Sequence, residues 1–576
     1  MRSHKQTKGE MVMTTKHEDY FQGLRQQIFN EEQWDSQVFV TFNHEASSGK
    51  SRYMHELLSQ VATTPPYHRA LYVQLFAGEE LANTVQSINQ HAGMIVAAEF
   101  IGGDKKIKYK LQQASEIPVL CVTHEMYFQF CRGNYSNLWC GRDILVIDEF
   151  PSFMHPIAIG GDELGQFVLN SIRHQDFGMK YLADKLMNKF VELERVYEDY
   201  LTNDIPFVRF PELSGDLSRL EATMNLVDDS VNKTLMENIH HLIKNGGYFF
   251  EGKFHTYDFR LPPLMLRNNV VLDANSGFDY RPELSDQFQV KRQDKLFDYS
   301  SSSLIHYAVD TGKTALGTYT NFAAQVLKEI SLEGCHGALF ITDKQNEKEV
   351  VESILAHFKE YGNTLEQISE NLGYPIAVDH FGNLTGVNKY RDFDTVLVLK
   401  TPNFNYMTYL LNHFYHTKQG RDNILFQDDE VQLVRRRMVA GEIYQSIHRI
   451  CRDHIRPAKI YVFCNNQEVV DTIVSELPGV QYVKKELAVS LKKRKRNAKG
   501  NGKNQVPQVT QFQQLLLEYK MSGADSVSKK EVQEKLGIKD ASNLNKLTRQ
   551  SKSFLQEKVI VVEHYDFRLN LMAEAN

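Results

Sequence analysis

Short apolar runs alternate with amphipathic stretches along residues 36–160 of this 576-residue chain, and the pattern returns from about residue 300. Each run is three to five residues long without interspersed polar positions, which is typical of strands buried on both faces of a parallel sheet. The pattern therefore predicts two α/β lobes, in which helices cover the sheets. The runs lie at 38–40, 70–73, 119–122 and 144–147 in the first region, and at 337–341, 396–399 and 460–463 in the second.

Residues 160–262 separate these two regions and have a helical period instead. Apolar residues recur there at steps of three and four, which predicts two amphipathic helices. Pro206 and Pro211 interrupt the chain between them, and Gly246 and Gly247 end the second helix. We expect a helical insertion, for which a long hairpin arm is one form. The apolar positions are 182, 186, 190, 193, 197 and 201, and then 220, 224, 227, 231, 235, 239 and 242.

The C-terminal part begins with a basic segment. Residues 484–504 hold nine Lys or Arg and one acidic residue, which indicates a solvated, flexible linker. Two short helices around Gly537, at 528–536 and 541–547, followed by two short strands, fit a winged-helix-like domain. The predicted domains are a disordered tail at 1–18, a first lobe at 19–159 and 263–299, the insertion at 160–262, a second lobe at 300–483, the linker at 484–504 and the winged-helix-like domain at 505–576.

Composition excludes few classes of function. The formal net charge is −6, so global charge argues neither for nor against binding to nucleic acid. Six widely scattered cysteines suit a reducing compartment, and no apolar run reaches the roughly 18 residues that span a bilayer. The polar first 18 residues lack the apolar core of a signal peptide. We therefore expect a cytoplasmic protein without a membrane partner.

Residues 44–51 read His-Glu-Ala-Ser-Ser-Gly-Lys-Ser and follow the first predicted strand. A helix that begins here would point unpaired N–H groups and the positive end of its dipole at a phosphate chain. Lys50 could reach the β- and γ-phosphates of a nucleotide, and the Ser51 hydroxyl could hold Mg²⁺. The strict pattern has Gly at the position of His44, and Gly-Lys-Ser triplets also occur in surface loops. A plain loop is the alternative.

The apolar run at 144–147 is followed directly by Asp148 and Glu149. Ligands bind at the carboxyl edge of parallel sheets, where these two carboxylates would lie. Asp148 could hold Mg²⁺, and Glu149 could polarise the water that attacks a phosphate. The alternative is a solvated strand end.

Gln445, Arg449 and Arg452 are spaced by four and three residues, so on a helix all three would project from one face. Two guanidinium groups and an amide on one face could receive an anion and stabilise the charge that develops during phosphoryl transfer. The alternative is a salt-bridged, exposed helix, because three arginines at 435–437 precede this segment.

In this order the three sites resemble the motifs of superfamily 2 helicases, which are two-lobed ATP-driven motors on nucleic acid. Residues 44–51 resemble the first motif, 148–151 the DEAD or DEAH motif, and 445–452 the Gln-x-x-Gly-Arg-x-x-Arg motif. Weaker matches lie in the expected order at 75–82, 123–126, 272–275 and 385–388. The Thr-His segment at 123–126 is similar to that of damage-inducible and repair-type DNA helicases. The resemblance covers roughly residues 20–465.

The resemblance implies two RecA-like lobes that bind ATP and Mg²⁺ between them and move along a single strand of nucleic acid. The implied catalytic residues are Glu149, Lys50, Arg449, Arg452 and Gln445. The implied nucleotide-binding residues are Ser47, Ser48, Gly49, Lys50, Ser51, Asp148 and Asn388, of which Ser51 and Asp148 would hold the metal. The implied nucleic-acid contacts are Thr123, His124 and Gly386.

Several positions depart from the family pattern. His44 and Ser47 stand where small residues or Gly are usual, His448 replaces the Gly of the last motif, and Asn275 replaces a Thr. None of these changes removes a charged catalytic group, so ATP hydrolysis is expected. Repair-type iron–sulfur helicases carry four cysteines between the first two main motifs. This chain has three there, Cys121, Cys131 and Cys140, so no cluster is expected. An adenine-reading glutamine could be Gln26 or Gln27.

The partner expected from these motifs is single-stranded or tailed nucleic acid, with DNA favoured by the Thr-His segment and the C-terminal domain. An RNA helicase is one alternative. Another is an ATP-switched scaffold that assembles partners without unwinding. The insertion could separate strands, dock a protein or simply pack. The basic run at 492–496 could hold phosphates, act as a nuclear address or serve as a tether.

Overall fold

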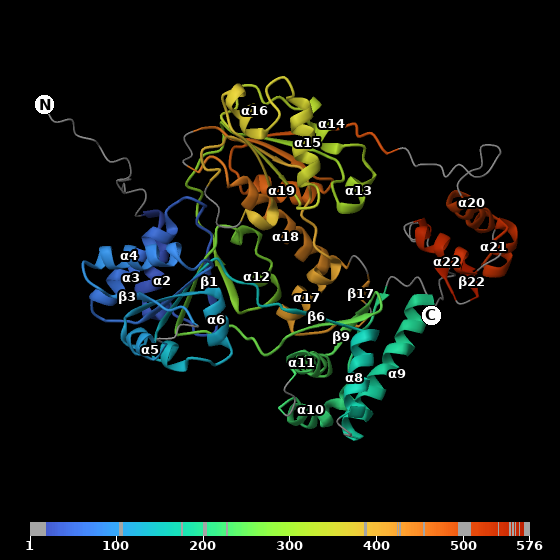
Figure 1. Cartoon of the computed structure of the whole chain (residues 1–576), viewed down its shortest axis with the longest axis horizontal. Coiled ribbons are helices and arrows are strands. Elements are labelled where there is room, and N and C mark those ends of the chain that lie inside the picture. The colour runs from blue at the N-terminus through green and yellow to red at the C-terminus, as the bar shows by residue number, and fades with distance from the viewer. Residues whose placement is uncertain are drawn as a thin grey trace. The chain divides into compact units, whose positions relative to one another are not determined.

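A computed structural model of the chain describes residues 19–569 except 103–106, 174–176, 200–203, 226–228, 385–388, 423, 426–427, 453–455, 493–507, 523, 539–540, 552–553, 556–557, 559 and 564. The chain forms two compact units (Figure 1). The first comprises the residues up to 154, 260–417 and 429–493, and it contains both predicted lobes except for residues 155–159 and 418–428. The second comprises 155–259, 418–428 and 494–576. The predicted tail at 1–18 lies outside the described residues.

The first lobe is built on seven strands in the order β12-β1-β11-β5-β2-β4-β3, and every neighbouring pair is parallel. Val40 and Phe42 of β1 and Tyr72 of β2 face α2, α3 and α4, and the resulting core is fully buried. The strands are β1 (Phe39–Phe42), β2 (Ala70–Gln74), β3 (Ala97–Glu99), β4 (Val119–Thr123), β5 (Ile144–Asp148), β11 (Asn268–Leu272) and β12 (Phe288–Lys291). The helices are α2 (Gln22–Phe29), α3 (Lys50–Thr63), α4 (Glu79–Ala92), α5 (Ile107–Glu116), α6 (His124–Cys131), α7 (Ser136–Trp139) and α12 (Arg281–Leu284), with short 3₁₀ turns at Glu31–Gln33 and Ser276–Phe278.

The second lobe has six strands in the order β15-β14-β16-β18-β13-β19, again parallel throughout. The fold class predicted from the apolar runs, two α/β lobes with parallel sheets, is therefore confirmed. The strands are β13 (Ser303–Tyr307), β14 (Ala338–Thr342), β15 (Ile376–His380), β16 (Thr395–Val398), β18 (Lys459–Phe463) and β19 (Gln481–Lys485). The helices are α13 (Lys313–Thr318), α14 (Phe322–Glu329), α15 (Glu347–His357), α16 (Leu365–Leu372), α17 (Tyr406–Thr417), α18 (Asp429–Ile447) and α19 (Gln467–Ser475), with a 3₁₀ turn at Phe381–Asn383.

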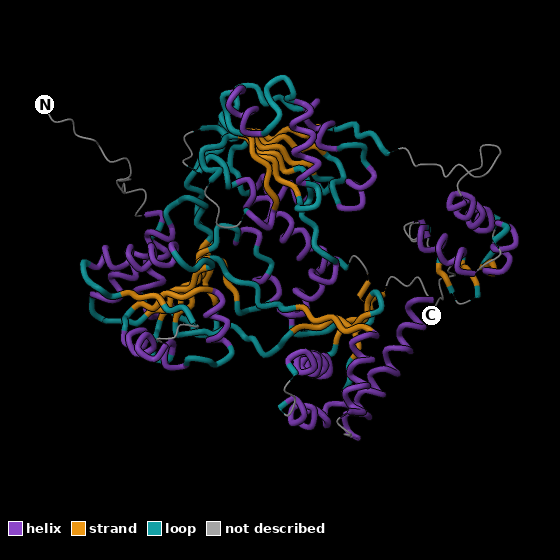
Figure 2. The backbone as a smooth tube through the Cα atoms, in the orientation of Figure 1, coloured by secondary structure: helices purple, strands orange, loops and turns teal. Residues whose placement is uncertain are grey.

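Both faces of the second sheet are buried, as the continuous apolar runs require. Leu339 and Ile341 of β14 pack against α18 and α19, whereas Phe340, between them, packs against α14 and α15. Successive side chains of a strand point to opposite faces, so each apolar run supplies two cores at once. Figure 2 shows this sheet with helices around it.

The insertion differs from the purely helical prediction. Its core joins α8 (Gly161–Arg173), α9 (Phe177–Asp199), α10 (Leu217–Met224) and α11 (Ser230–Asn245) to an antiparallel sheet. The sheet has the order β6-β10-β9-β8, with β6 (Pro156–Gly160), β8 (Phe207–Val208), β9 (Gly247–Phe250) and β10 (Lys253–Tyr257). The stretch expected as one helix at 220–242 is divided into α10 and α11, because Asp229 caps a new helix by accepting from the Val231 N–H at 3.0 Å.

A segment from the second lobe joins the insertion. Residues 418–428 lie between α17 and α18, and their strand β17 (Ile424–Leu425) pairs antiparallel with β7 (Asp204–Ile205) of the insertion. Arg209 forms an ion pair with Asp422 at 2.8 Å, and the Arg421 N–H donates to the Tyr248 hydroxyl at 3.2 Å. Gly420 lies so close to the Phe207 ring that a Cβ there would overlap it.

The C-terminal domain has the element order helix, strand, helix, helix, strand, strand. The two helices around Gly537 and the two strands after them were predicted, whereas the strand before them was not. The three antiparallel strands of the domain have the order β20-β22-β21 and close over a core that includes Phe512, Leu544 and Phe567. The elements are α20 (Gln508–Met521), β20 (Ser526–Ser528), α21 (Lys529–Leu536), α22 (Ala541–Gln550), β21 (Val561–Val562) and β22 (Asp566–Arg568).

The basic segment begins later than its composition predicts. Lys484 and Lys485 belong to the edge strand β19, and the Lys492 N–H donates to the Thr318 carbonyl at 2.8 Å. Residues 484–492 therefore belong to the second lobe, and the rest of the predicted linker, 493–504, lies outside the described residues. None of the helices in the described part of the chain is long and apolar enough to cross a bilayer.

Candidate active site

The loop at 43–49 connects the end of β1 with the start of α3 at the carboxyl edge of the first sheet. Gly49 and Ser47 both have left-handed backbone angles, with φ of 90° and 65°. Gly adopts such angles without cost, whereas Ser47 adopts them only under strain, and strain of this kind clusters at functional sites. Left-handed turns at a helix N-terminus direct N–H groups into an anion-binding concavity. Lys50, the first residue of α3, forms no ion pair with any described residue.

His44 stands where the phosphate-loop pattern has Gly, and it is completely buried. Its ring packs against Tyr20, Phe21 and Phe42 with centroid distances of 4.9, 4.7 and 5.8 Å. Burial lowers the pKa of His44 to about 4, so its ring is neutral at pH 7. His44 therefore fills the core beneath the loop and adds no charge to it.

Glu45 anchors the loop to the segment that connects the two lobes. Its buried carboxylate accepts hydrogen bonds from the Leu296 N–H, from the Phe297 N–H at 3.1 Å and from the Tyr299 hydroxyl at 3.1 Å. The Tyr299 ring in turn contacts His448 of the last motif, with centroids 6.0 Å apart. Sequence reasoning missed this link, because Glu45 occupies a variable position of the loop motif.

Ser51 and Asp148, the two residues predicted to hold the metal, lie side by side. The Ser51 hydroxyl donates to Asp148 Oδ2 at 2.9 Å, and the Tyr72 hydroxyl donates to the same oxygen at 3.0 Å. Tyr72 is buried in β2, and its pKa is raised by burial and by the charge of Asp148, so it remains a hydrogen-bond donor. Tyr72 orients Asp148, a role that the apolar pattern of β2 conceals.

Glu149 follows β5 with a left-handed backbone, φ 63°, and its N–H donates to the Leu272 carbonyl at 3.0 Å. Burial raises the pKa of this carboxyl, and the charges of Asp273 and Asp148 raise it further. Lys50 and Arg449 act in the opposite direction. A carboxylate with a raised pKa, between two acids and two cations, has the environment of a general base. Asp273, at the end of β11, is thus a further contributor to the site.

The segment with Gln445, Arg449 and Arg452 departs from the single helix that its spacing predicts. Helix α18 ends at Ile447, so only Gln445 is helical. The N–H groups of His448, Arg449 and Ile450 still donate to the preceding turn, to the carbonyls of Tyr444, Ser446 and Ile447. The chain then joins the segment before β16: Cys451 donates to the Phe393 carbonyl at 2.8 Å and Arg452 to the Arg391 carbonyl at 3.1 Å. Cys451 takes a left-handed φ of 48° at this bend.

Arg449 is buried, and its Nε has no hydrogen-bond partner among the described residues. Burial and the neighbouring Arg452 lower the pKa of this guanidinium to about 10, so it is charged at neutral pH. Glu149 of the first lobe interacts electrostatically with both arginines. An unsatisfied, buried cation of this kind calls for an anion. The structure thus brings Lys50, Asp148 and Glu149 of the first lobe together with Arg449 and Arg452 of the second.

Direct contacts hold the two lobes together in this arrangement. Arg437 of α18 forms an ion pair with Glu283 of α12 at 3.2 Å, and the Tyr280 hydroxyl donates to Asn412 Oδ1 at 2.9 Å. Phe278 packs on Tyr444 with ring centroids 4.9 Å apart.

The residues predicted to contact nucleic acid are less accessible than expected. Thr123 is 9% exposed and its hydroxyl caps α6 by accepting from the Met126 N–H at 3.3 Å. His124 is 8% exposed, and its pKa is lowered by burial and partly restored by the backbone and charge of Asp148. Contact with nucleic acid by these two residues stays a prediction. Gly386 and Asn388 lie outside the described residues.

The remaining candidates have structural roles. The side chain of Gln27 is buried, donates to Asn268 Oδ1 at 3.0 Å and accepts from Lys291 Nζ at 2.8 Å, so it has no group left for an adenine. Gln26 is exposed. Cys121 is buried in β4, and Cys131 Sγ accepts from the Leu264 N–H at 3.2 Å.

No protein-family model and no curated protein sequence matches this chain. Its fold is similar to that of several solved structures. Xpd4 of S. tokodaii is 14% identical, with 77% of this chain and 96% of that chain covered and a TM-score of 0.45. The DExH-box NTPase HrpB of E. coli is 10% identical, with 97% and 50% covered and a TM-score of 0.37. Dbp5 of S. cerevisiae bound to RNA and ADP BeF3 is 8% identical, with 83% and 94% covered and a TM-score of 0.33.

The two parallel sheets of this chain are the architecture that the sequence resemblance implied.

Proposed function

We propose that this chain is an ATP-dependent helicase or translocase that acts on single-stranded nucleic acid, with DNA as the favoured substrate. The observation that carries the proposal is the convergence of Lys50 and Glu149 from one lobe with Arg449 from the other. A triphosphate is the ligand that such a set fits, because its terminal phosphate can contact both lobes at once.

The metal and the nucleotide fit the residues present. Ser51 and Asp148 already share a hydrogen bond, and a hydroxyl next to a carboxylate suits Mg²⁺, which takes oxygen ligands and keeps several waters. Bound there, Mg²⁺ would neutralise charge on the phosphates. Ser47, Ser48 and Gly49 would offer backbone N–H groups to the nucleotide, with Asn388 as a further proposed contact. The unpaired Nε of Arg449 would receive a phosphate oxygen.

Each side chain of the site would have a separate role in ATP hydrolysis. Glu149 would accept a proton from the attacking water, and Lys50 would hold the terminal phosphates. Arg449, Arg452 and Gln445 would stabilise the charge that develops on the transferred group, and their loss of contact after hydrolysis would let the lobes part. Nucleic acid would lie across both lobes near Thr123, His124 and Gly386.

A second function, an ATP-switched scaffold without unwinding, is favoured by one observation. Ser47 and His44 replace the small residues of an efficient phosphate loop, and Ser47 carries backbone strain. Such a scaffold would bind ATP and nucleic acid and turn over slowly.

The deciding experiment measures ATP turnover with and without single-stranded DNA or RNA of equal length, followed by displacement of 3′- and 5′-tailed duplexes. A motor shows stimulated turnover and displacement from one tail only. Lys50→Ala is the control for a contaminating ATPase. Turnover that survives this substitution would remove the motor assignment, and stimulated turnover without displacement would favour the scaffold or a translocase.

The proposed base predicts a pH dependence. Only deprotonated Glu149 can accept a proton, so kcat should fall on the acid side as the pH drops through its raised pKa, above the ordinary value near 4.3. Asp273→Asn removes a like charge beside Glu149, which lowers that pKa and shifts the acid limb to lower pH. The measurement is kcat between pH 5 and 8. An acid limb that stays in place or shifts upward would contradict this assignment of the base.

A further inference from the structure

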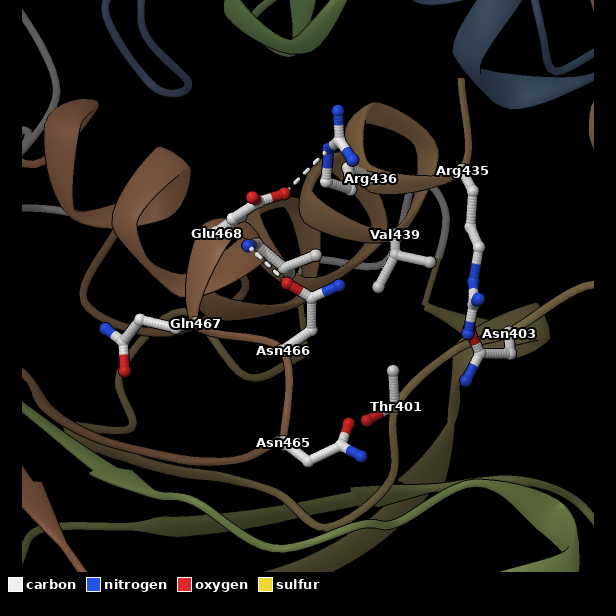
Figure 3. A pocket seen from close by; sticks show the side chains of 10 residues that line it. Thr401, Asn403, Arg435, Arg436, Val439, Asn465, Asn466, Gln467 and Glu468 are labelled. Atoms are coloured by element: carbon white, nitrogen blue, oxygen red, sulfur yellow. Dashed lines mark hydrogen bonds and ion pairs between the residues drawn. The ribbon is translucent and has the colours of Figure 1, made fainter. Parts of the chain in front are cut away.

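The second lobe has a polar pocket at the carboxyl edge of its sheet, and its lining does not include the arginines of the active site. Its volume is about 510 Å³. Loops after β16 and β18 form one side, and residues of α18 and the first turn of α19 form the other (Figure 3). The lining residues are Thr401, Asn403, Arg435, Arg436, Val439, Asn465, Asn466, Gln467, Glu468 and Val469.

Charge in this pocket is unevenly compensated. Arg436 forms an ion pair with Glu468 at 3.0 Å. Arg435 instead donates to two amide oxygens, Asn403 Oδ1 at 3.1 Å and Gln432 Oε1 at 3.3 Å, and it forms no ion pair with a described residue. Three of its five N–H groups make these bonds, counting a third bond to Asn403 at 3.3 Å, and its side chain also interacts with the Tyr409 hydroxyl. The pocket therefore holds one net positive charge with donors to spare, and it suits a phosphate.

The remaining walls suit the neutral part of a nucleotide. Figure 3 shows the side chains of Thr401 and Asn465 pointing toward each other across the pocket. Next to Asn403 in the chain stands Phe404, whose ring is 43% exposed and is fixed edge-on against Tyr409 at 6.1 Å. An exposed aromatic ring beside a cationic, amide-lined pocket is the combination with which proteins hold single strands, through stacking of bases and pairing with phosphates.

We propose that this pocket and Phe404 form a binding site for one nucleotide unit of single-stranded nucleic acid. Arg435 pairs with the backbone phosphate, and Phe404 stacks on the base. The inference rests on the proposed function and adds its contact surface on the second lobe. It also gives a route for coupling: Arg435 lies in α18, and this helix ends at Ile447, two residues before Arg449.

The test is the affinity of the whole chain for fluorescent dT and rU oligonucleotides, measured by anisotropy over a range of salt concentrations. Arg435→Gln should weaken binding about tenfold and reduce the slope of log K against log salt by about 0.7, the value for one lost contact to a single strand. Phe404→Ala should weaken binding about tenfold with the slope unchanged, and Phe404→Trp should retain the affinity.

The matched control is Lys359→Gln, which removes one exposed positive charge beyond the end of α15, toward the amino edge of the same sheet. It should bind like the wild type. The thermal midpoints of all variants report on folding. Comparing dT with rU distinguishes DNA from RNA as the source of the strand.

The outcomes separate the two claims. Wild-type protein that binds no oligonucleotide would overturn both the proposed function and this site. Wild-type binding that Arg435→Gln and Phe404→Ala leave unchanged would overturn the site alone. Displacement of the oligonucleotide by thymidine monophosphate at equal nucleotide concentration would overturn the polynucleotide assignment, since the pocket would then hold free nucleotides.

Discussion

Arg449→Gln should lower the rate of ATP hydrolysis by about 10³-fold or more, the range found for arginines that stabilise phosphoryl transfer from a second lobe or subunit. Arg449 is buried, and its Nε has no hydrogen-bond partner among the described residues. A bound anion would offset the desolvation penalty of this guanidinium by pairing with it. The measurement is kcat under saturating ATP together with the affinity for nucleotide.

The same variant should keep its stability, because the substitution removes a buried cation whose Nε has no hydrogen-bond partner among the described residues. We expect its thermal midpoint to equal or exceed that of the wild type, which distinguishes lost chemistry from lost folding. Arg456→Gln is the control, since Arg456 is an exposed arginine of the same segment. Hydrolysis at the wild-type rate in Arg449→Gln would show that Arg449 supplies no charge to the reaction.

Glu149→Gln should lower kcat by about 10²- to 10⁴-fold, the usual contribution of a general base, while ATP still binds. The amide keeps the shape of the side chain and removes its ability to accept a proton. It also removes a negative charge that faces Asp273 and Asp148, so nucleotide affinity should be equal or higher.

Glu125→Gln is the matched control for this prediction. Glu125 is an exposed carboxylate in the first turn of α6, near Glu149 in the sequence, and it is not among the groups that shift the pKa of Glu149. An unchanged kcat in Glu149→Gln would assign the base to another group, with Asp273 as the first to test.

The apolar runs predicted both sheets because a strand buried on two faces leaves a continuous hydrophobic signature. This hydrophobic signature is absent from exposed edge strands and from short strands between helices. Strand β19, at the edge of the second sheet, is largely exposed and reads Gln-Tyr-Val-Lys-Lys, so its last two residues, Lys484 and Lys485, fall within the predicted basic linker. The antiparallel sheet of the insertion was missed because its strands are short and lie between strong helical periods.

The candidate site was predictable where side-chain chemistry is tied to local sequence. Ser51 and Asp148 belong to motifs at strand ends, and their meeting follows from the parallel order of β1, β11 and β5. Tyr72 and Glu45 were not predictable, because their roles depend on partners 76 and more than 250 residues away. The path of the chain after the end of α18 likewise involves tertiary hydrogen bonds to Arg391 and Phe393, which no spacing rule contains.

Residues 418–428, which pack with the insertion, come from the part of the chain that forms the second lobe. The insertion is connected to the first lobe at 154–155 and 259–260, and residues 418–428 add two connections to the second lobe at 417–418 and 428–429. The insertion is therefore joined covalently to both lobes, through two connections to each. Any change in the spacing of the lobes would act on all four connections.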